Sequence, residues 1–91
     1  MLLEIITPEA VIFNNQVEVV SLPGVNGEFQ ILNNHAPIVS TLKKGFVKIK
    51  GDFESTESFE KIFSKKDNVW SLMIDSGTVE SNDNKVVILI D

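Results

Sequence analysis

The stretch Phe46-Val47-Lys48-Ile49-Lys50 alternates apolar and charged side chains with a period of two. Successive side chains of a β-strand point to opposite faces of the sheet. Val47 and Ile49 would therefore face a core, and the lysines that follow each of them would face solvent. The pattern predicts a half-buried strand and favours a fold built from sheets.

Further short runs of strand-forming residues recur along the chain, separated by residues that form turns. The run at 85–90 is apolar on both faces, so both of its faces need cover. Runs this short and this evenly spaced are typical of an all-β sandwich or barrel. Besides 46–50, the predicted strands are 17–22, 38–42, 70–75, 78–80 and 85–90, and the predicted turns lie at 23–24, 33–34, 44–45, 51–52, 76–77 and 82–84.

The polar segment at 52–68 breaks this pattern. Within it, Phe59, Ile62 and Phe63 recur at i, i+3 and i+4, which is the spacing of one helix face. The part at 53–66 therefore holds either a short surface helix, which the spacing favours, or a long hairpin. In both cases the segment is an insertion or an extended hairpin within the sheet fold.

The composition limits the fold and the function. The chain has 91 residues, of which 43% are hydrophobic, so we expect one domain spanning 1–91 with one modest core. It has no cysteine, which excludes disulfides and thiolate metal sites. The formal net charge is −5 and every basic residue except the single histidine is lysine, which argues against a nucleic-acid surface.

The sequence carries no sign of a targeting segment or a membrane span. Its start, Met1-Leu2-Leu3-Glu4, lacks a basic region followed by a long apolar stretch. No apolar run approaches the roughly 18 residues that cross a bilayer. We therefore expect a soluble chain that is cytoplasmic or peripheral to a membrane.

Three features that resemble chemical sites have simpler interpretations. His35 is the only histidine and has no other metal ligand nearby, so we interpret it as a hydrogen-bonding turn residue. The glycines of 24–27 lack the lysine of a phosphate-binding loop and precede Glu28, so we interpret them as turn formers. The acidic residues look like solvated faces. We therefore expect no catalytic, cofactor-binding or metal-binding residue.

Two other binding functions stay open at this point. Lys43 or Lys44, at an expected hairpin tip, could carry a lipoyl or biotinyl group, as in small acidic carrier domains. A carbohydrate-binding sandwich would need exposed aromatic side chains, which Trp70 and the phenylalanines of 52–68 would have to supply. An added cofactor mass would indicate the first function, and retention on a glycan array the second.

The string from Leu22 to Ile38, LPGVNGEFQILNNHAPI, resembles the signature of the epsilon subunit of F-type ATP synthases, called delta in mitochondria. That signature reads roughly as Pro-Gly, two residues, Gly-Glu, an apolar strand, a turn, and His-Ala-Pro before apolar residues. The resemblance covers nearly the whole chain except 52–68. Further matching stretches are 3–9 with Phe13, 42–45, 75–80 and 86–91.

The resemblance implies a ten-stranded flattened sandwich with hairpin and Greek-key connections. It implies a non-catalytic rotor subunit at the foot of the central stalk, which joins the gamma subunit to the membrane c-ring. The whole F1 complex, with its alpha3beta3 part, is then the larger partner in proton- or sodium-driven ATP synthesis. Such a subunit is peripheral to the cytoplasmic face of the bacterial plasma membrane, without insertion, and needs no cofactor and no nucleic acid.

The same resemblance assigns roles to five positions. Glu28 and Phe29 match the loop that faces the c-ring. Thr7, His35 and Ser40 match positions on the gamma-facing side. An exposed carboxylate on a glycine-shaped loop can orient against a polar or basic surface, and His35 and Ser40 can form hydrogen bonds at a wet edge. We expect these contacts to form one rim of the sandwich, around Glu28 and His35.

Four departures from the family pattern are informative. Gln30 stands where glycine is common, Asn33-Asn34 replaces a Pro-Gly turn, and 52–68 is extra. Longer members continue into a C-terminal helical hairpin, whereas this sequence stops at Asp91. We therefore expect no inhibition of ATP hydrolysis by helix insertion, and no nucleotide site.

The closing strand has two apolar sets of side chains. Val86, Ile88 and Ile90 face one way. Val87 and Leu89 face the other way. One set enters the core and the other needs a cover, because large bare apolar patches are unusual on a monomer. We expect that cover from gamma, or from Phe53, Phe59, Ile62 and Phe63 folding over part of the sandwich.

Overall fold

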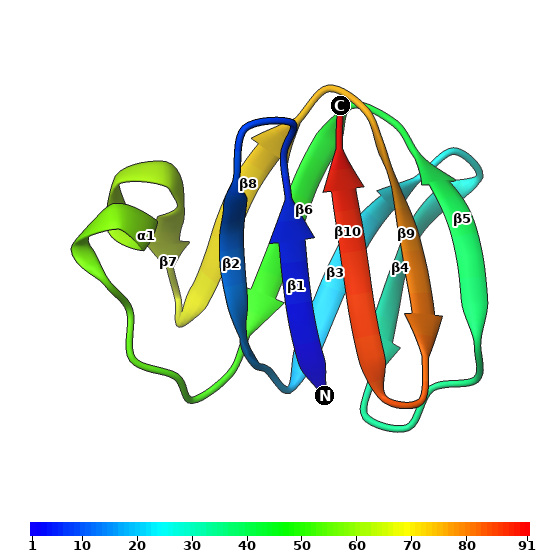
Figure 1. Ribbon diagram of the computed structural model, residues 1–91, viewed down its shortest axis with the longest axis horizontal. Helices are drawn as coiled ribbons and strands as arrows, with labels where there is room; N and C mark the ends of the chain where they lie inside the picture. Colours follow the sequence, from blue (N-terminus) through cyan, green and yellow to red (C-terminus); the bar gives the residue numbers. More distant parts are fainter.

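Ten strands and one short helix make up the computed structural model, which describes residues 1–91 (Figure 1). The predicted all-β class is therefore confirmed. The elements, in chain order, are β1 (Leu2–Ile6), β2 (Val11–Gln16), β3 (Val19–Gly24), β4 (Gly27–Leu32), β5 (Ile38–Leu42), β6 (Gly45–Lys50), α1 (Glu57–Ile62), β7 (Ser64–Lys66), β8 (Val69–Ile74), β9 (Gly77–Asn82) and β10 (Lys85–Ile90).

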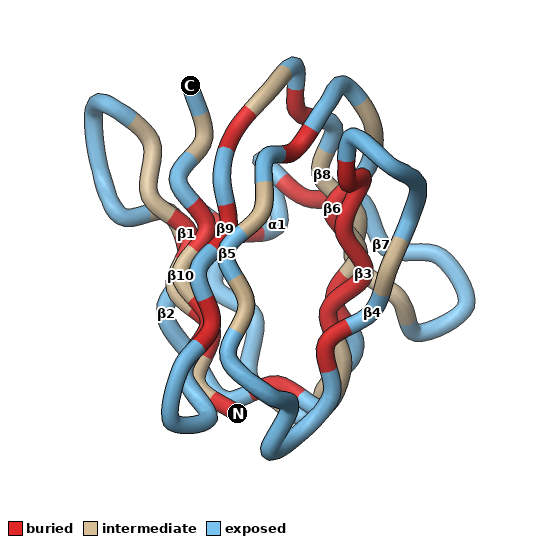
Figure 2. Tube along the Cα trace, turned by 90° about the vertical axis from the view of Figure 1, so that its right-hand side faces the viewer, coloured by how far each residue is buried: buried red, intermediate tan, exposed pale blue.

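The strands form two facing layers (Figures 1 and 2). Their hydrogen-bonded order is β2-β1-β10-β9-β5-β3-β6-β8-β7, with β4 paired to β3. We call β2, β1, β10, β9 and β5 the front layer and the other strands the back layer. The layers join where β5 meets β3, at the pair Gly24–Leu42. This is the ten-stranded sandwich that the sequence resemblance implied.

Both layers contribute buried residues to one core, and Figure 2 marks these residues in red. Val47 and Ile49 are fully buried and Lys50 is exposed, as their alternation predicted. From β10, Val86 and Ile88 are fully buried, so their set is the one that enters the core. Burying one such side chain contributes about 1.5–3 kcal/mol, so contact between the layers is the main source of stability.

The predicted strand boundaries agree with the structure at most positions. The strands expected at 38–42 and 85–90 coincide with β5 and β10. The strand expected at 17–22 begins two residues later, at Val19. Val17 is buried in the connection before it, where its N–H donates to the carbonyl oxygen of Met1 at 2.9 Å.

The inserted segment contains both of the elements that the sequence left open. Helix α1 begins after Thr56, whose side chain accepts a hydrogen bond from the N–H of Phe59 at 3.2 Å. Ser, Thr, Asp and Asn are the residues that favour this capping position. After the helix, β7 and β8 form a hairpin through Asp67 and Asn68, whose φ angles are 53° and 64°. Asn and Asp adopt this left-handed backbone more easily than most residues.

Five aromatic side chains, which we call the aromatic cluster, join the insertion to the sandwich. They come from β2, from β8 and from the segment around α1, which lies beside β2 and β8 in Figure 1. Ile62 is not part of the cluster and is 45% exposed, although its spacing predicted that it would share a face with the phenylalanines. The members of the aromatic cluster are Phe13, Phe53, Phe59, Phe63 and Trp70.

The aromatic cluster does not cover the outer side of β10. It packs at Phe13 of β2, and β1 separates β2 from β10 in the front layer. Leu89 accordingly stays 47% exposed and Val87 is half-buried. The three inserted phenylalanines therefore fold over part of the sandwich, as the second alternative expected, but the expectation that the segment covers Val87 and Leu89 is wrong.

Candidate functional site

The β3–β4 turn is shaped by two glycines. A Cβ on Gly24 would lie 2.8 Å from the carbonyl oxygen of Gly27 and 2.8 Å from the ring of Phe29, so no larger residue fits without movement. Gly27 has a φ of +125°, which side-chain-bearing residues rarely adopt. The turn interpretation of 24–27 agrees with this geometry, which fixes the position of Glu28, the second residue of β4.

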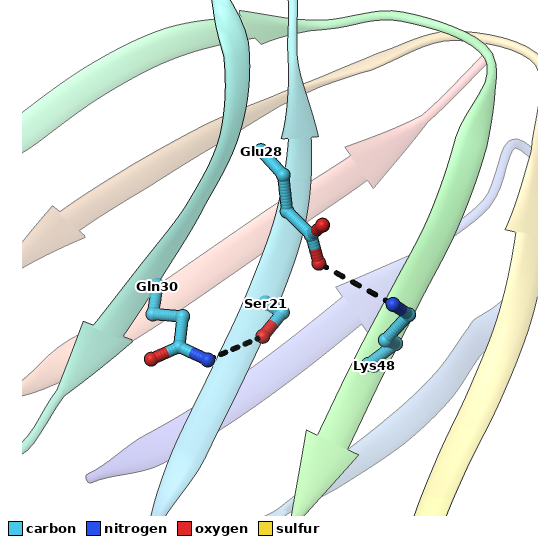
Figure 3. A network of polar contacts seen from close by, with 4 residues as sticks. All are labelled: Ser21, Glu28, Gln30 and Lys48. Carbon is cyan, nitrogen blue, oxygen red and sulfur yellow. Dashed lines mark hydrogen bonds and ion pairs between the residues drawn. The ribbon is translucent and has the colours of Figure 1, made fainter.

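Glu28 lies on the outer face of the back layer (Figure 3). Its Oε1 atom is 3.4 Å from Nζ of Lys48, and the side chains of Glu28 and Lys48 are 56% and 43% exposed. Next to them, Nε2 of Gln30 donates to Oγ of Ser21 at 3.2 Å. Exposed ion pairs contribute about 0–1 kcal/mol, so this contact orients Glu28 more than it stabilises the fold.

Phe29 follows Glu28 but faces the other side of β4. Its ring is half-buried and packs against the core, beside Gly24. Glu28 and Phe29 therefore cannot present their side chains to one surface together. The structure brings Glu28 to the outside and uses Phe29 to hold the β3–β4 turn from within.

Thr7, His35 and Ser40 lie in three different places. Thr7 is in the β1–β2 turn, where its Oγ1 accepts from the N–H of Ala10 at 3.2 Å. His35 is in the β4–β5 loop, with Nδ1 2.7 Å from the carbonyl oxygen of Ala36. Ser40 is half-buried in the middle of β5.

The structure separates residues that the sequence grouped. Figure 1 shows the β1–β2 turn and the β4–β5 loop at opposite ends of the sandwich. Glu28 is the second residue of β4, whereas His35 lies in the loop three residues after the end of the same strand. The expectation of one rim around Glu28 and His35 is therefore wrong, because β4 runs the length of the layer between them.

An exposed apolar stripe on the outer side of the front layer was not identified as a site from the sequence. We call this side, centred on Val39, Val87 and Leu89, the front face. Val39 is 80% exposed and Leu89 is 47% exposed. The pairing register carries Val87 and Val39 to the two sides of Glu80, so acidic and apolar side chains alternate across the strands. The alternation of side chains along a strand could have revealed this face. Val39 is three residues before Leu42, so the two side chains point to opposite sides, and because Leu42 is buried Val39 points outward.

The remaining candidates are placed as follows. Lys43 and Lys44 lie in the β5–β6 turn, where the N–H of Lys43 donates to the carbonyl oxygen of Pro23 at 2.8 Å. Trp70 is half-buried against Phe59, and Nζ of Lys65 lies 5.4 Å from its ring centre, so it offers no open stacking platform. No group of three or more His, Asp or Glu side chains is placed to hold a metal ion.

Comparison with known proteins identifies the family. The model of the ATP synthase delta/epsilon chain β-sandwich domain matches residues 1–91. The chain belongs to this family. The family match thus agrees with the signature at 22–38 and extends across the inserted segment.

Several curated proteins are similar to this chain. The ATP synthase epsilon chain of Campylobacter fetus subsp. fetus is 43% identical over 89 residues, which are 98% of this chain and 59% of that protein. That of Campylobacter concisus is 40% identical and also 59% covered. The epsilon chain of Chlorobium limicola is 33% identical and 86% covered. This chain therefore spans about three fifths of the Campylobacter proteins, and more of the Chlorobium one.

Two solved structures share the fold. One is the central stalk and c-ring of the Tetrahymena thermophila mitochondrial ATP synthase, with a TM-score of 0.75, 16% identity, and coverage of 98% of this chain and 61% of the matched chain. The other is from the Euglena gracilis mitochondrial ATP synthase, with a TM-score of 0.75, 18% identity and coverage of 97% and 48%. In this chain itself, α1 is far too short to cross a bilayer.

Proposed function

We propose that this chain acts as a non-catalytic rotor subunit of an F-type ATP synthase, coupling the gamma subunit to the c-ring during ion-driven ATP synthesis. The observation that carries this proposal is the family match across all of residues 1–91. Together with the rest of the F1 complex, it would work at the cytoplasmic face of the plasma membrane. No step of the chemistry is assigned to its own side chains.

The architecture suits a part that transmits torque. A coupling element must keep its shape while force passes through it, and protein cores are closely packed and resist compression. Here the two layers share a continuous apolar core. The aromatic cluster extends that core to the open side between β2 and β8. A stiff sandwich of this kind passes rotation from one partner to the other.

The front face is our proposed contact for gamma. Thr7 and His35 lie at opposite ends of the sandwich, and Ser40 lies on β5 between those ends. Ser40 has the parity of buried Leu42 and pairs with buried Val79, so its side chain points away from the front face, and we base the proposed contact on exposed Leu89 and Val39 instead. Burial of such side chains contributes about 25 cal/mol for each square ångström of apolar area, which makes this stripe a suitable docking surface.

Glu28 is our proposed contact for the c-ring. Its carboxylate is exposed and held only by Lys48, a pair that a partner can replace at little cost. Phe29 would act from inside, because its ring packs beneath the β3–β4 turn and fixes the position of Glu28. Charge contacts of this type set orientation and association rate more than affinity.

Copurification with the cognate partners tests the proposal. The chain carrying an affinity tag is expressed in cells that also produce gamma and the c-ring of the same organism. We expect gamma to be retained by the tagged chain, and the c-ring to be retained only when gamma is present or when salt is low. Absence of gamma across a range of salt concentrations would refute the rotor assignment.

A further inference from the structure

Strand β2 ends the front layer and has one free edge. It pairs with β1 on one side and with no strand on the other. At the opposite end of that layer, β5 pairs with both β9 and β3. A free edge presents unpaired N–H and C=O groups to which another extended chain can add.

The alternation of hydrogen-bonded and non-hydrogen-bonded residue pairs between β1 and β2 shows which N–H and C=O groups of β2 point away from β1. Met1 and Val17 exchange two hydrogen bonds, of 3.1 Å and 2.9 Å, just beyond the end of the β1–β2 ladder. Bonded and non-bonded pairs alternate along an antiparallel ladder. The pair Glu4–Asn14 is therefore a non-bonded one, and the N–H and C=O of Asn14 point away from β1.

The main-chain amides of Asn14 and Gln16, which both point away from β1, differ in whether a side chain caps them. The N–H of Gln16, which has the same phase as that of Asn14, donates to Oδ1 of Asn15 at 2.8 Å. The N–H of Asn14 has no such side-chain cap and no partner among the turn and loop bonds. Asn14 therefore leaves one main-chain donor and one acceptor open at the centre of the edge.

A shallow groove of about 220 Å³ runs along this edge. One wall is β2, residues 11–15, and the other includes Glu54, Thr56 and Phe59. Phe13 and Phe59 supply its apolar floor, with ring centres 5.2 Å apart. An added strand would place alternate side chains on this floor.

One carboxylate, that of Glu54, lines the groove, and it belongs to an inserted segment that is acidic overall. Asp52, Glu54, Glu57 and Glu60 lie in the inserted segment, where Lys61 is the only basic residue before β7. Lys61 sits 3.6 Å from Glu57 and leaves the others without a basic partner. These charges favour a basic occupant over an acidic one.

The edge strand of the back layer, β7, is less suited to accept another strand than β2. Strand β7 has three residues, Ser64–Lys66, two of which are lysines. Short edge strands that carry lysine are a common protection against pairing with other chains. Strand β2 is twice as long, with six residues, and has no lysine and no proline. Of the two edges that border α1, β2 is therefore the one suited to accept a strand.

We propose that the free edge of β2 is a strand-addition site for an extended basic segment of a partner protein. The segment would pair with the main chain of Asn14 and place apolar side chains over Phe13 and Phe59. Its lysine or arginine side chains would face the carboxylates of the inserted segment. This site is separate from the front face, so its failure leaves the rotor assignment untouched.

Peptide binding to the full 91-residue chain tests this site. The probe is a synthetic hexapeptide with blocked ends in which lysine and valine alternate. Its binding is measured by the changes in the amide NMR shifts and in the amide hydrogen exchange of the 91-residue chain. We expect shifts confined to β2 and the facing inserted segment, with slower exchange at the Asn14 amide. Shifts centred on β4 or β7, or no binding at millimolar peptide, would overturn the proposal.

Matched variants distinguish main-chain pairing from nonspecific binding of the peptide. Asn14→Pro removes the outward N–H, and proline is tolerated on edge strands. We expect binding to weaken about fivefold or more, since one main-chain hydrogen bond has this order of effect. Asn14→Ala keeps the N–H and should bind like the original chain. Equal binding by both variants would contradict strand addition.

Two further probes keep the test decisive if Asn14→Pro fails to fold. A hexapeptide with N-methylated main-chain amides cannot form the ladder, and we expect it not to bind the unaltered chain. A glutamate–valine hexapeptide should also fail, because Glu54 lines the groove and the inserted segment around it is acidic. Binding of the methylated peptide at the original affinity would refute main-chain pairing, and binding of the acidic one would refute the charge preference.

Discussion

The ring of Phe59 meets the ring of Trp70 edge-on, with centroids 4.8 Å apart and an interplanar angle of 71°. This contact joins α1 to β8, and the stacked pair of Phe59 and Phe63, 4.2 Å apart, extends it. The inserted segment is thus part of the folded core. It closes the side of the sandwich that the two layers leave open.

Removing the Phe59 ring should therefore weaken the whole domain. We expect Phe59→Ala to lower the free energy of unfolding by about 3–5 kcal/mol, because it leaves a cavity under the helix. Trp70 is the only tryptophan, so its fluorescence reports the change directly. Ile62→Ala is the control, since Ile62 is 45% exposed and should cost far less. Equal losses in the two variants would show that the aromatic cluster is not a core.

The cap of α1 can be tested without disturbing that cluster. Thr56→Ala removes the oxygen that accepts from the N–H of Phe59, and we expect a loss of about 1 kcal/mol. Thr56→Ser keeps an acceptor and should retain most of the stability. Urea unfolding of both variants provides the measurement. A serine variant as unstable as the alanine variant would contradict the capping role.

The close approach at Gly24 predicts a different kind of sensitivity. An added Cβ would meet Phe29 at 2.8 Å, so we expect Gly24→Ala to cost about 1–3 kcal/mol through displacement of that ring. At Gly27 nothing lies within 4 Å of an added Cβ, and the cost of alanine comes from its φ of +125° alone. Amide NMR distinguishes the cases, because only Gly24→Ala should shift the core around Phe29.

Reversing the charge of Glu28 tests its proposed role at the c-ring. We expect Glu28→Lys to change the free energy of unfolding by less than about 1 kcal/mol, because its pair with Lys48 is exposed. Retention of the c-ring should fall at low salt and approach the original level as salt screens both forms. Glu57→Lys reverses the other exposed ion pair, with Lys61, and should have no effect on the c-ring. Similar losses from both reversals would argue against a specific contact at Glu28.

Local alternation was enough to predict much of the sandwich. Val47 and Ile49 were assigned to the core and are fully buried there. The period of two fixes the face of each side chain. In a sheet that is covered on one side only, this alternation is enough to predict which side chains are buried. For the same reason, the exposure of Val39 follows once Leu42 is known to point inward.

Longer-range features were not available from local patterns. The helical spacing of Phe59, Ile62 and Phe63 predicted one shared face, yet α1 ends at Ile62 and Phe63 continues in an extended backbone, with ψ of 148°. Phe63 then reaches the aromatic cluster from outside the helix, and Ile62 is left in solvent. The burial of one residue after a helix depends on the partner it meets, which spacing does not encode.

The candidate contact residues show the same limit. The signature places Glu28 and His35 seven positions apart, and a strand lies between them. Nearness in sequence suggested one rim, but a strand rises about 3.3 Å per residue and carries them to opposite ends. Thr7 and Ser40 are likewise separated, and the side chain of Ser40 has the inward parity of Leu42, which the signature alone does not reveal.

The most direct test of a rotor subunit that binds gamma through its front face is site-specific photo-cross-linking in the assembled ATP synthase, from Leu89 on the front face and from Met73 on the back layer. The two side chains are almost equally exposed, at 47% and 48%, so accessibility does not distinguish them. Our account predicts that the probe at position 89 cross-links to gamma and that the probe at position 73 does not. A gamma cross-link from position 73 alone, or from neither position, would contradict it.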